Sequence, residues 1–126
     1  MLYTVRGLED GARGVTIRVR VLRKEDPRVV KAKDGKEHRV VDVLVGDVTG
    51  ITTLVLWDDM VDQVSDGDIA DIRNGYVNRF KGRLRLNVGK NGELERVEDD
   101  KFLKAEQILE MGEKSIGVDD PSDIYP

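Results

Sequence analysis

The feature that most constrains this chain is a strict alternation of apolar and polar residues in two segments. Val15–Val21 reads Val-Thr-Ile-Arg-Val-Arg-Val, and Arg83–Val88 reads Arg-Leu-Arg-Leu-Asn-Val. A β-strand points successive side chains to opposite faces, so this pattern predicts strands with one buried face and one exposed face. We therefore expect a chain built mainly of antiparallel strands around one apolar core.

Three further segments are predicted strands because they are rich in β-branched and other apolar residues. They are Glu37–Val45, Ile51–Trp57 and Ile69–Phe80, and the last is long enough to need a bend, which Gly75 would allow. Turn-forming residues separate the five strands, at 33–36, 46–50, 66–68 and 81–82. Asn91-Gly92 is predicted to be another turn, before a last short strand over residues 93–97.

Residues 58–65 favour a short helix between the third and fourth strands, with Asp58 or Asp59 as its N-cap. Five strands with a helix at this place predict an all-β, five-stranded OB-fold Greek-key barrel. The helix position favours this fold over an SH3-like barrel or an immunoglobulin sandwich.

The C-terminal part of the chain differs in composition from the rest. A second short helix is predicted over residues 102–111, and from Gly112 onward the composition is typical of a flexible tail. We therefore divide the chain into an OB-fold domain, residues 1–98, and an acidic C-terminal segment, residues 99–126.

Charge is distributed unevenly along the 126 residues. Residues 1–92 hold 17 Lys and Arg against 14 Asp and Glu, whereas residues 93–126 hold 4 against 11. Residues 73–90 carry six cations and no acid. A ligand responds to the local field, so the net charge of −4 does not exclude a partner rich in phosphates.

Several kinds of chemistry are disfavoured by composition. The chain has no cysteine and one histidine, His38, which excludes thiolate nucleophiles, cysteine zinc sites and multi-histidine metal sites. The aspartates near residues 58–68 lack the spacing of a calcium loop, so we expect no metal, no cofactor and no enzyme activity. With no membrane-spanning run and a charged N-terminus, a cytoplasmic, nucleoid-associated location is expected, or a nuclear one in a eukaryote.

The aromatic residues are placed where a ligand could reach them. Tyr76 and Phe80 share one face of the fourth strand with Asn74 and Asn78, a composition that argues against burial. Trp57 ends the third strand on the face opposite Leu54 and Leu56, and the fifth strand is expected to point Arg83, Arg85 and Asn87 outward. Aromatic rings stack on bases with little sequence preference, and adjacent cations neutralise phosphates, so this face predicts binding of single-stranded nucleic acid.

Several ordered strings resemble a known family. They are VGDVTG (45–50), LVLWDD (54–59), GDI (67–69), GYVNRFKGRLRLNVG (75–89) and, less directly, KAKDGKEHR (31–39). Over about residues 8–97 the chain resembles the simple single-OB-fold single-stranded-DNA-binding proteins of archaea and eukaryotes, which are relatives of the DNA-binding domains of replication protein A. The resemblance implies sequence-tolerant binding of single-stranded DNA and a role in replication, recombination or repair.

The resemblance places the base-stacking aromatics at Trp57, Tyr76 and Phe80. It also implies basic contacts with DNA at Lys33, Arg39, Lys81 and Lys90. The other expected contacts are the basic or amide side chains Arg79, Arg83, Arg85 and Asn87. Asn87 stands where some relatives carry an aromatic residue, which leaves Arg85 as a substitute stacking group.

Two other functions remain open. Stacking and phosphate contacts do not separate DNA from RNA, so an RNA- or tRNA-binding OB domain is one alternative. A protein-interaction OB subunit of a larger complex is the other, with an exposed apolar patch at Leu2, Tyr3 and Val5.

The last residues, Asp119–Pro126, combine three carboxylates with Ile124 and Tyr125. They look similar to the acidic tip with which bacterial single-stranded-DNA-binding proteins dock partner enzymes. We expect this tail to recruit replication or repair proteins, or to compete with DNA for the basic face.

Overall fold

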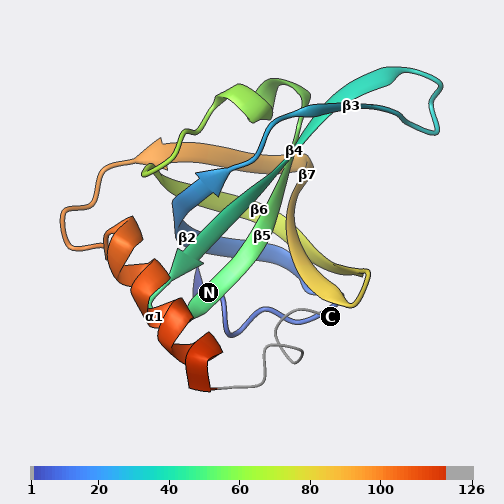
Figure 1. Cartoon of the computed structure of the whole chain (residues 1–126). Helices are drawn as coiled ribbons and strands as arrows, with labels where there is room; N and C mark the ends of the chain where they lie inside the picture. The colour runs from blue at the N-terminus through green and yellow to red at the C-terminus, as the bar shows by residue number, and fades with distance from the viewer. Residues whose placement is uncertain (1, 119–126) are drawn as a thin grey trace.

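Five long strands close into a barrel (Figure 1): β2 (Arg13–Lys24), β4 (Glu37–Asp47), β5 (Gly50–Trp57), β6 (Ile69–Phe80) and β7 (Arg83–Val97). Their order around the barrel is β2-β6-β7-β5-β4, and a pairing of β4 with β2 completes the circle. Every neighbouring pair is antiparallel except β5 and β7, which run parallel. This computed structural model describes residues 2–118, and their side chains as far as Met111. The predicted five-stranded OB-fold barrel is confirmed.

The barrel interior is filled by the apolar half of each alternating strand. In β2 the side chains of Val15, Ile17, Val19 and Val21 are completely buried, as the period-two pattern predicts. The other strands contribute Val41, Val43, Val45, Leu54, Leu56, Ala70, Ile72, Val77 and Leu86. These buried residues are all aliphatic, so the core forms without Trp57, Tyr76 or Phe80.

Two short strands extend the sheet at its edges. Strand β1 (Leu2–Tyr3) pairs in parallel with β2, and β3 (Arg28–Lys31) pairs with the beginning of β4. The β3–β4 hairpin projects from the barrel (Figure 1). We expected only a loop there. The strand forms because Asp34 and Gly35 close a tight turn, in which the Asp34 carboxylate accepts a hydrogen bond from the Lys36 N–H at 2.8 Å.

Strand β7 runs without interruption through Asn91-Gly92, where a turn and a separate short strand were predicted. Its pairing with β6 is regular from Phe80–Arg83 to Gly75–Val88, and then resumes at Arg73–Glu93. Residues 89–92 are therefore extra on β7, opposite Asn74 of β6, which adopts a left-handed φ of 56°. The predicted bend near Gly75 is this bulge.

The predicted helix between the third and fourth strands is a 3₁₀ helix, η1 (Asp58–Asp62), which ends three residues before Ser65. Trp57 occupies its N-cap position and no side chain caps it, so the expectation that Asp58 or Asp59 would do so is wrong. Asp58 instead has a φ of 52° and turns its carboxylate toward β4.

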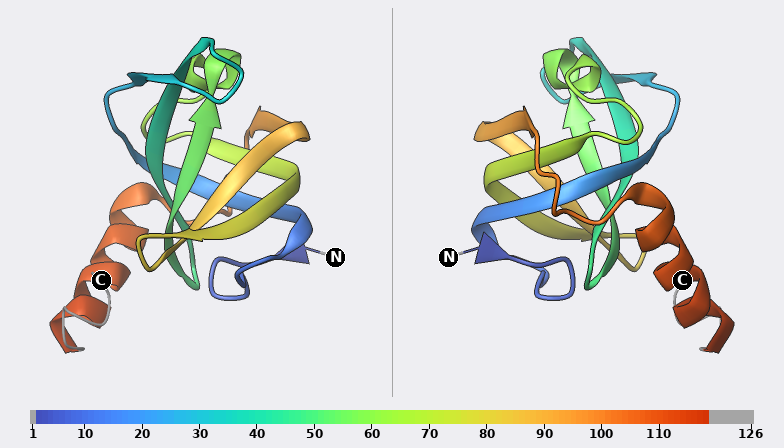
Figure 2. Two further views of the ribbon diagram at one scale, coloured as in Figure 1. Left: turned by 90° about the vertical axis from the view of Figure 1, so that its right-hand side faces the viewer. Right: turned by 90° about the vertical axis from the view of Figure 1, so that its left-hand side faces the viewer.

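Helix α1 (Ala105–Val118) begins three residues later than predicted and continues past Gly112, so the tail expected from Gly112 is helical as far as Val118. Its Ile108 side chain is buried against Gly46, where a Cβ would lie 2.8 Å from Ile108 Cγ2. Figure 2 shows α1 away from the end of the barrel where η1 and the β3–β4 hairpin lie together. The acidic segment Asp119–Pro126 lies outside the described residues.

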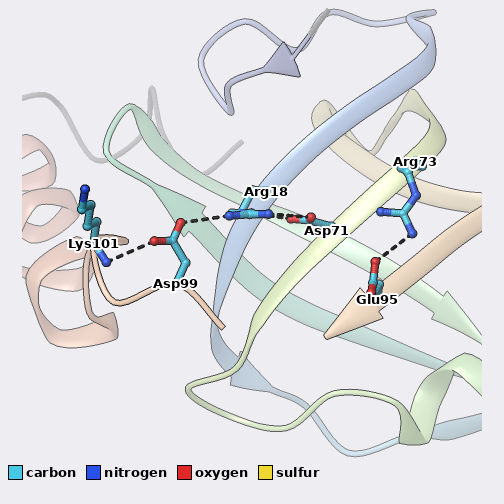
Figure 3. A network of polar contacts seen from close by, with 6 residues as sticks. All are labelled: Arg18, Asp71, Arg73, Glu95, Asp99 and Lys101. Carbon is cyan, nitrogen blue, oxygen red and sulfur yellow. Dashed lines mark hydrogen bonds and ion pairs between the residues drawn. The ribbon is translucent and has the colours of Figure 1, made fainter. Parts of the chain in front are cut away.

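The chain between β7 and α1 is attached to the barrel by two arginines of β2. Figure 3 shows Arg18 between Asp71 of β6 and Asp99, with N···O distances of 2.6 and 2.9 Å. Arg20 donates hydrogen bonds to the carbonyl oxygens of Phe102 and Leu103. The outward side chains of β2 therefore hold the segment that precedes the helix. No helix within residues 2–118 has the length and apolar character that crossing a bilayer requires.

Candidate nucleic-acid interface

Strand register places the three aromatic residues on one outer face of the barrel. Tyr76 of β6 lies opposite Asn87 of β7, which in turn lies beside Val55 of β5. Trp57 follows Val55 by two residues and Phe80 follows Tyr76 by four, so both point to that same face. We call this surface, made by Trp57, Tyr76, Asn78 and Phe80, the aromatic face.

The aromatic rings lie outside the core, as the sequence predicts. Trp57 is 39 % exposed, Tyr76 40 % and Phe80 52 %. Large aromatic side chains are costly to leave in water, because each could bury a large apolar area. Since the aliphatic interior is already filled, these rings are available to a ligand.

The ring of Tyr76 lies over a glycine. A Cβ on Gly89 would be 3.1 Å from Tyr76 Cε1 and 3.3 Å from Tyr76 Cδ1. Gly89 is the first residue of the β7 bulge, so the bulge supplies the flat backbone surface on which the ring rests. A side chain at this position would displace the ring.

The ring of Phe80 is contacted by two cations. The guanidinium of Arg85 is 5.0 Å from the ring centroid, and the ammonium of Lys81 is 5.4 Å from it. The Arg85 side chain is only 15 % exposed, because Asp42 of β4 holds it in an ion pair. Arg85 therefore lies on the outer side of β7, as the strand pattern predicts, but it is largely covered and supports Phe80.

Asn87 is also covered rather than displayed, with only 6 % of its surface exposed. Its Nδ2 donates to the Arg85 carbonyl at 3.2 Å and to Asn78 Oδ1 at 3.0 Å. Because the Arg85 carbonyl can only accept a hydrogen bond, the Asn87 side chain must point its NH₂ group toward it. The same NH₂ group then requires the oxygen of the Asn78 amide to face Asn87. Asn78, which was not among the predicted contacts, lies between Tyr76 and Phe80 along β6, and its Oδ1 is bound by Asn87.

Trp57 is in contact with the only histidine of the chain. The ring of His38 meets the indole edge to face, with centroids 5.9 Å apart and an interplanar angle of 72°. Asp58 Oδ2 is 2.8 Å from His38 Nδ1, and Asp34 Oδ2 is 3.0 Å from His38 Nε2. His38 therefore links the β3–β4 hairpin and η1 beside Trp57.

Several of the predicted cations are neutralised by carboxylates of the chain itself. Arg39 forms two hydrogen bonds with Asp62, at 2.8 and 3.1 Å, which hold the pKa of that carboxyl below its usual range. Arg79 points to the other side of β6, where Asp10 lies 3.6 Å from its guanidinium. Within the basic stretch 73–90, Arg79 and Arg85 both have a carboxylate partner, so the stretch is less positive in the folded chain than in the sequence.

The remaining predicted cations surround the aromatic face. Lys33 lies in the turn of the β3–β4 hairpin, Lys81 in the β6–β7 turn and Lys90 in the β7 bulge, and all three are exposed. Within the part of the chain whose side chains are described, none of these lysines forms an ion pair with a carboxylate. Arg83 lies directly opposite Phe80 across the hairpin.

His38 and Asn78 are the two residues of the site that sequence reasoning missed. The strand pattern placed Asn78 on the face of Tyr76 and Phe80 but assigned it no contact. His38 could be found only from the register of the β3–β4 hairpin, which puts it opposite Val30 and within reach of Asp58.

The geometry agrees with comparisons to known proteins. Residues 8–96 match the family model described as single-stranded DNA binding protein Ssb-like, OB fold. This chain belongs to that family. It is 30 % identical over 106 residues to the single-stranded DNA binding protein Ssb of Saccharolobus solfataricus, covering 84 % of the chain and 71 % of the relative.

Two further proteins are similar to this chain. An uncharacterised Arabidopsis thaliana protein is 32 % identical over 100 residues, which cover 72 % of this chain and 65 % of the relative. The second OB-fold domain of replication protein A from Methanococcus maripaludis superposes with a TM-score of 0.67 at 26 % identity, covering 79 % of this chain and 98 % of that domain. The predicted family is therefore confirmed, and its Saccharolobus solfataricus relative is named a single-stranded DNA binding protein.

Proposed function

We propose that this chain binds single-stranded DNA with little sequence preference and acts in replication, recombination or repair. Trp57, Tyr76 and Phe80 stack on bases, and Lys33, Lys81 and Lys90 contact phosphates. The observation that carries the proposal is the exposure of three rings on one face of a barrel whose interior is aliphatic. Stacking on such rings contributes about 1–3 kcal/mol per base and accepts every base.

The direct test is a titration of the single tryptophan with an oligo(dT) strand. Because Trp57 is the only tryptophan, its emission reports on the proposed site alone. We expect quenching by single-stranded DNA and much weaker binding of the corresponding duplex. Tighter binding of a matched RNA strand would instead support the RNA-binding alternative, and the absence of any quenching or binding would contradict the proposal.

The lysines are expected to determine the salt dependence of binding. Replacing Lys33, Lys81 and Lys90 by glutamine should reduce the slope of log affinity against log salt by about 0.7 per lysine, because each phosphate contact releases condensed counterions. Titrations at several salt concentrations measure the slope. Lys101→Gln, an equal charge change on the segment before α1, is the control and should leave the slope nearly unchanged.

Gly89→Val tests whether DNA binding depends on the packing of the Tyr76 ring against Gly89, without removing the ring. The new Cβ lies 3.1 Å from Tyr76 Cε1, closer than an ordinary contact, and the two methyl groups beyond it need further room, so the ring is expected to shift. We expect affinity for oligo(dT) to fall about fivefold or more, which is the effect of weakening one stacked base. An unchanged affinity in a variant of unchanged melting temperature would show that Tyr76 need not rest on Gly89.

A further inference from the structure

Both ring nitrogens of His38 face a carboxylate oxygen. Nδ1 lies 2.8 Å from Asp58 Oδ2, and Nε2 lies 3.0 Å from Asp34 Oδ2. A neutral imidazole has one N–H and one lone pair, so one of these contacts would set a lone pair against a carboxylate. Only the doubly protonated ring donates to both. The geometry therefore describes an imidazolium between two aspartates.

The two aspartates belong to segments that flank Trp57. Asp34 lies in the turn of the β3–β4 hairpin, next to Lys33, and its Oδ1 accepts from the Lys36 N–H. Asp58 directly follows Trp57, and its Oδ1 accepts from the Arg39 N–H at 3.1 Å. The imidazolium thus joins the hairpin to the first residue of η1, with the indole against its ring.

The two aspartates are the charged groups that face the His38 ring. Asp58 and Asp34 act on its charge, and their hydrogen bonds, that of Asp58 first, raise the pKa of His38 above its ordinary value. Strand β5 contributes the uncharged indole of Trp57, and β3 contributes the uncharged Val30. The next residue on β4, Arg39, has its guanidinium bound by Asp62 of η1.

We propose that protonated His38 is a positioning residue that holds the β3–β4 hairpin and the start of η1 beside Trp57, so that affinity for single-stranded DNA falls when the ring loses its proton. This inference rests on the proposed function. Deprotonation changes the net charge of His38, Asp34 and Asp58 together from −1 to −2. This negative charge lies next to Lys33, which is proposed to contact phosphates. Deprotonation also breaks one of the two hydrogen bonds, which frees the hairpin that carries Lys33.

The sign of the effect on folding is the same. Because the pKa of His38 is higher in the folded chain than in the unfolded one, its contribution to stability is present at low pH. That contribution is lost as the pH rises through the folded-state pKa. The free energy of unfolding of the natural chain should therefore decrease over that interval, relative to the His38→Gln variant.

The experiment measures oligo(dT) affinity between about pH 5 and 8.5, a range in which histidine is the side chain that ordinarily titrates. The affinity of the natural chain should fall about two- to fivefold as the pH rises, the effect of one exposed ion pair. His38→Gln, which cannot titrate, should show no such step. NMR of the single histidine of the DNA-free chain gives the midpoint independently.

Asp34→Asn separates positioning from simple charge. The asparagine keeps the oxygen that accepts from Lys36 but removes one acceptor for the imidazolium, so the midpoint should move to lower pH. Asp59→Asn is the matched control, because it removes an equal charge from η1 at a residue that has no hydrogen bond with His38. Its midpoint should equal that of the natural chain.

The outcomes separate the two proposals. Binding that does not change with pH, or that changes equally in His38→Gln, would overturn the inference and leave the proposed function standing. Failure of the natural chain to bind oligo(dT) at any pH would overturn both.

Discussion

Replacing Trp57, Tyr76 and Phe80 together by alanine is expected to lower the affinity for single-stranded DNA by at least about a hundredfold. Each ring stacked on a base contributes about 1–3 kcal/mol, and 1.4 kcal/mol corresponds to a factor of ten. The triple variant should fold, because all three rings lie outside the aliphatic core. Fluorescence anisotropy of a labelled oligo(dT) strand measures the loss, and circular dichroism checks the barrel.

Val48→Ala is the matched control for an exposed apolar side chain. Val48 is 61 % exposed in the turn between β4 and β5, and it does not belong to the aromatic face. Its removal should leave affinity within about twofold, as for an ordinary surface substitution. A triple variant that binds as tightly as the natural chain would mean that DNA is held elsewhere, or by phosphate contacts alone.

Leu54→Ala is expected to give the largest loss of stability, about 2–5 kcal/mol in the free energy of unfolding. Leu54 is completely buried at the centre of β5, between Val43 of β4 and Leu86 of β7. The close packing of these three strands leaves little room for the cavity to collapse. Urea denaturation measures the change in midpoint at constant slope.

Two control variants test whether the loss of stability in Leu54→Ala comes from the cavity in the core. Leu54→Met conserves volume and should cost less than about 1.5 kcal/mol. Val29→Ala removes methyl groups that are already in water, since Val29 is 62 % exposed, and should be nearly neutral. If Leu54→Ala were no more destabilising than Val29→Ala, the core would not be packed as described.

The alternating strands could be read from the sequence because one physical rule decides them. Val15 to Val21 must place every second side chain in the interior, and β6 begins and ends at the predicted residues, Ile69 and Phe80. The same parity puts Tyr76 and Phe80 outside. The fold and the three rings follow from local pattern, and the family resemblance agrees with that pattern.

The ion pairs could not be predicted, because they depend on register between distant strands. A regular hairpin around Lys81-Gly82 would set Arg73 opposite Lys90. The surface of β6 and β7 around Arg73 would then be strongly basic. The bulge at residues 89–92 instead brings Glu93 and Glu95 to Arg73, at 3.1 and 3.0 Å. The bulge itself needs Gly92, where a Cβ would lie 2.9 Å from Val88 Cγ1.

The attachment of the C-terminal segment to the barrel could not be predicted for a related reason. The sequence predicted a helix over residues 102–111 and a flexible tail from Gly112, but not that Asp99 binds Arg18 (Figure 3) or that the chain remains helical to Val118. It also did not show that Ile108 packs on Gly46. Composition reports the average preference of a segment, whereas one buried isoleucine and one ion pair determine where it lies. Similarly, His38 gains its significance only from Asp34 and Asp58, which approach it from two turns.

The shortest pairing around the barrel joins β5 to β7, which share only three pairs of partners, from Thr53–Arg85 to Val55–Asn87. Local opening has the lowest free-energy cost where the fewest contacts must break. We therefore expect the barrel to open first at the β5–β7 pairing. Trp57 lies on the β5 side of this pairing, and Tyr76 and Phe80 lie on the β7 side, on β6. Small movements of this pairing would change the spacing between the rings while the rest of the barrel stays folded. Under the proposed function, the aromatic face then adjusts to bases of different size.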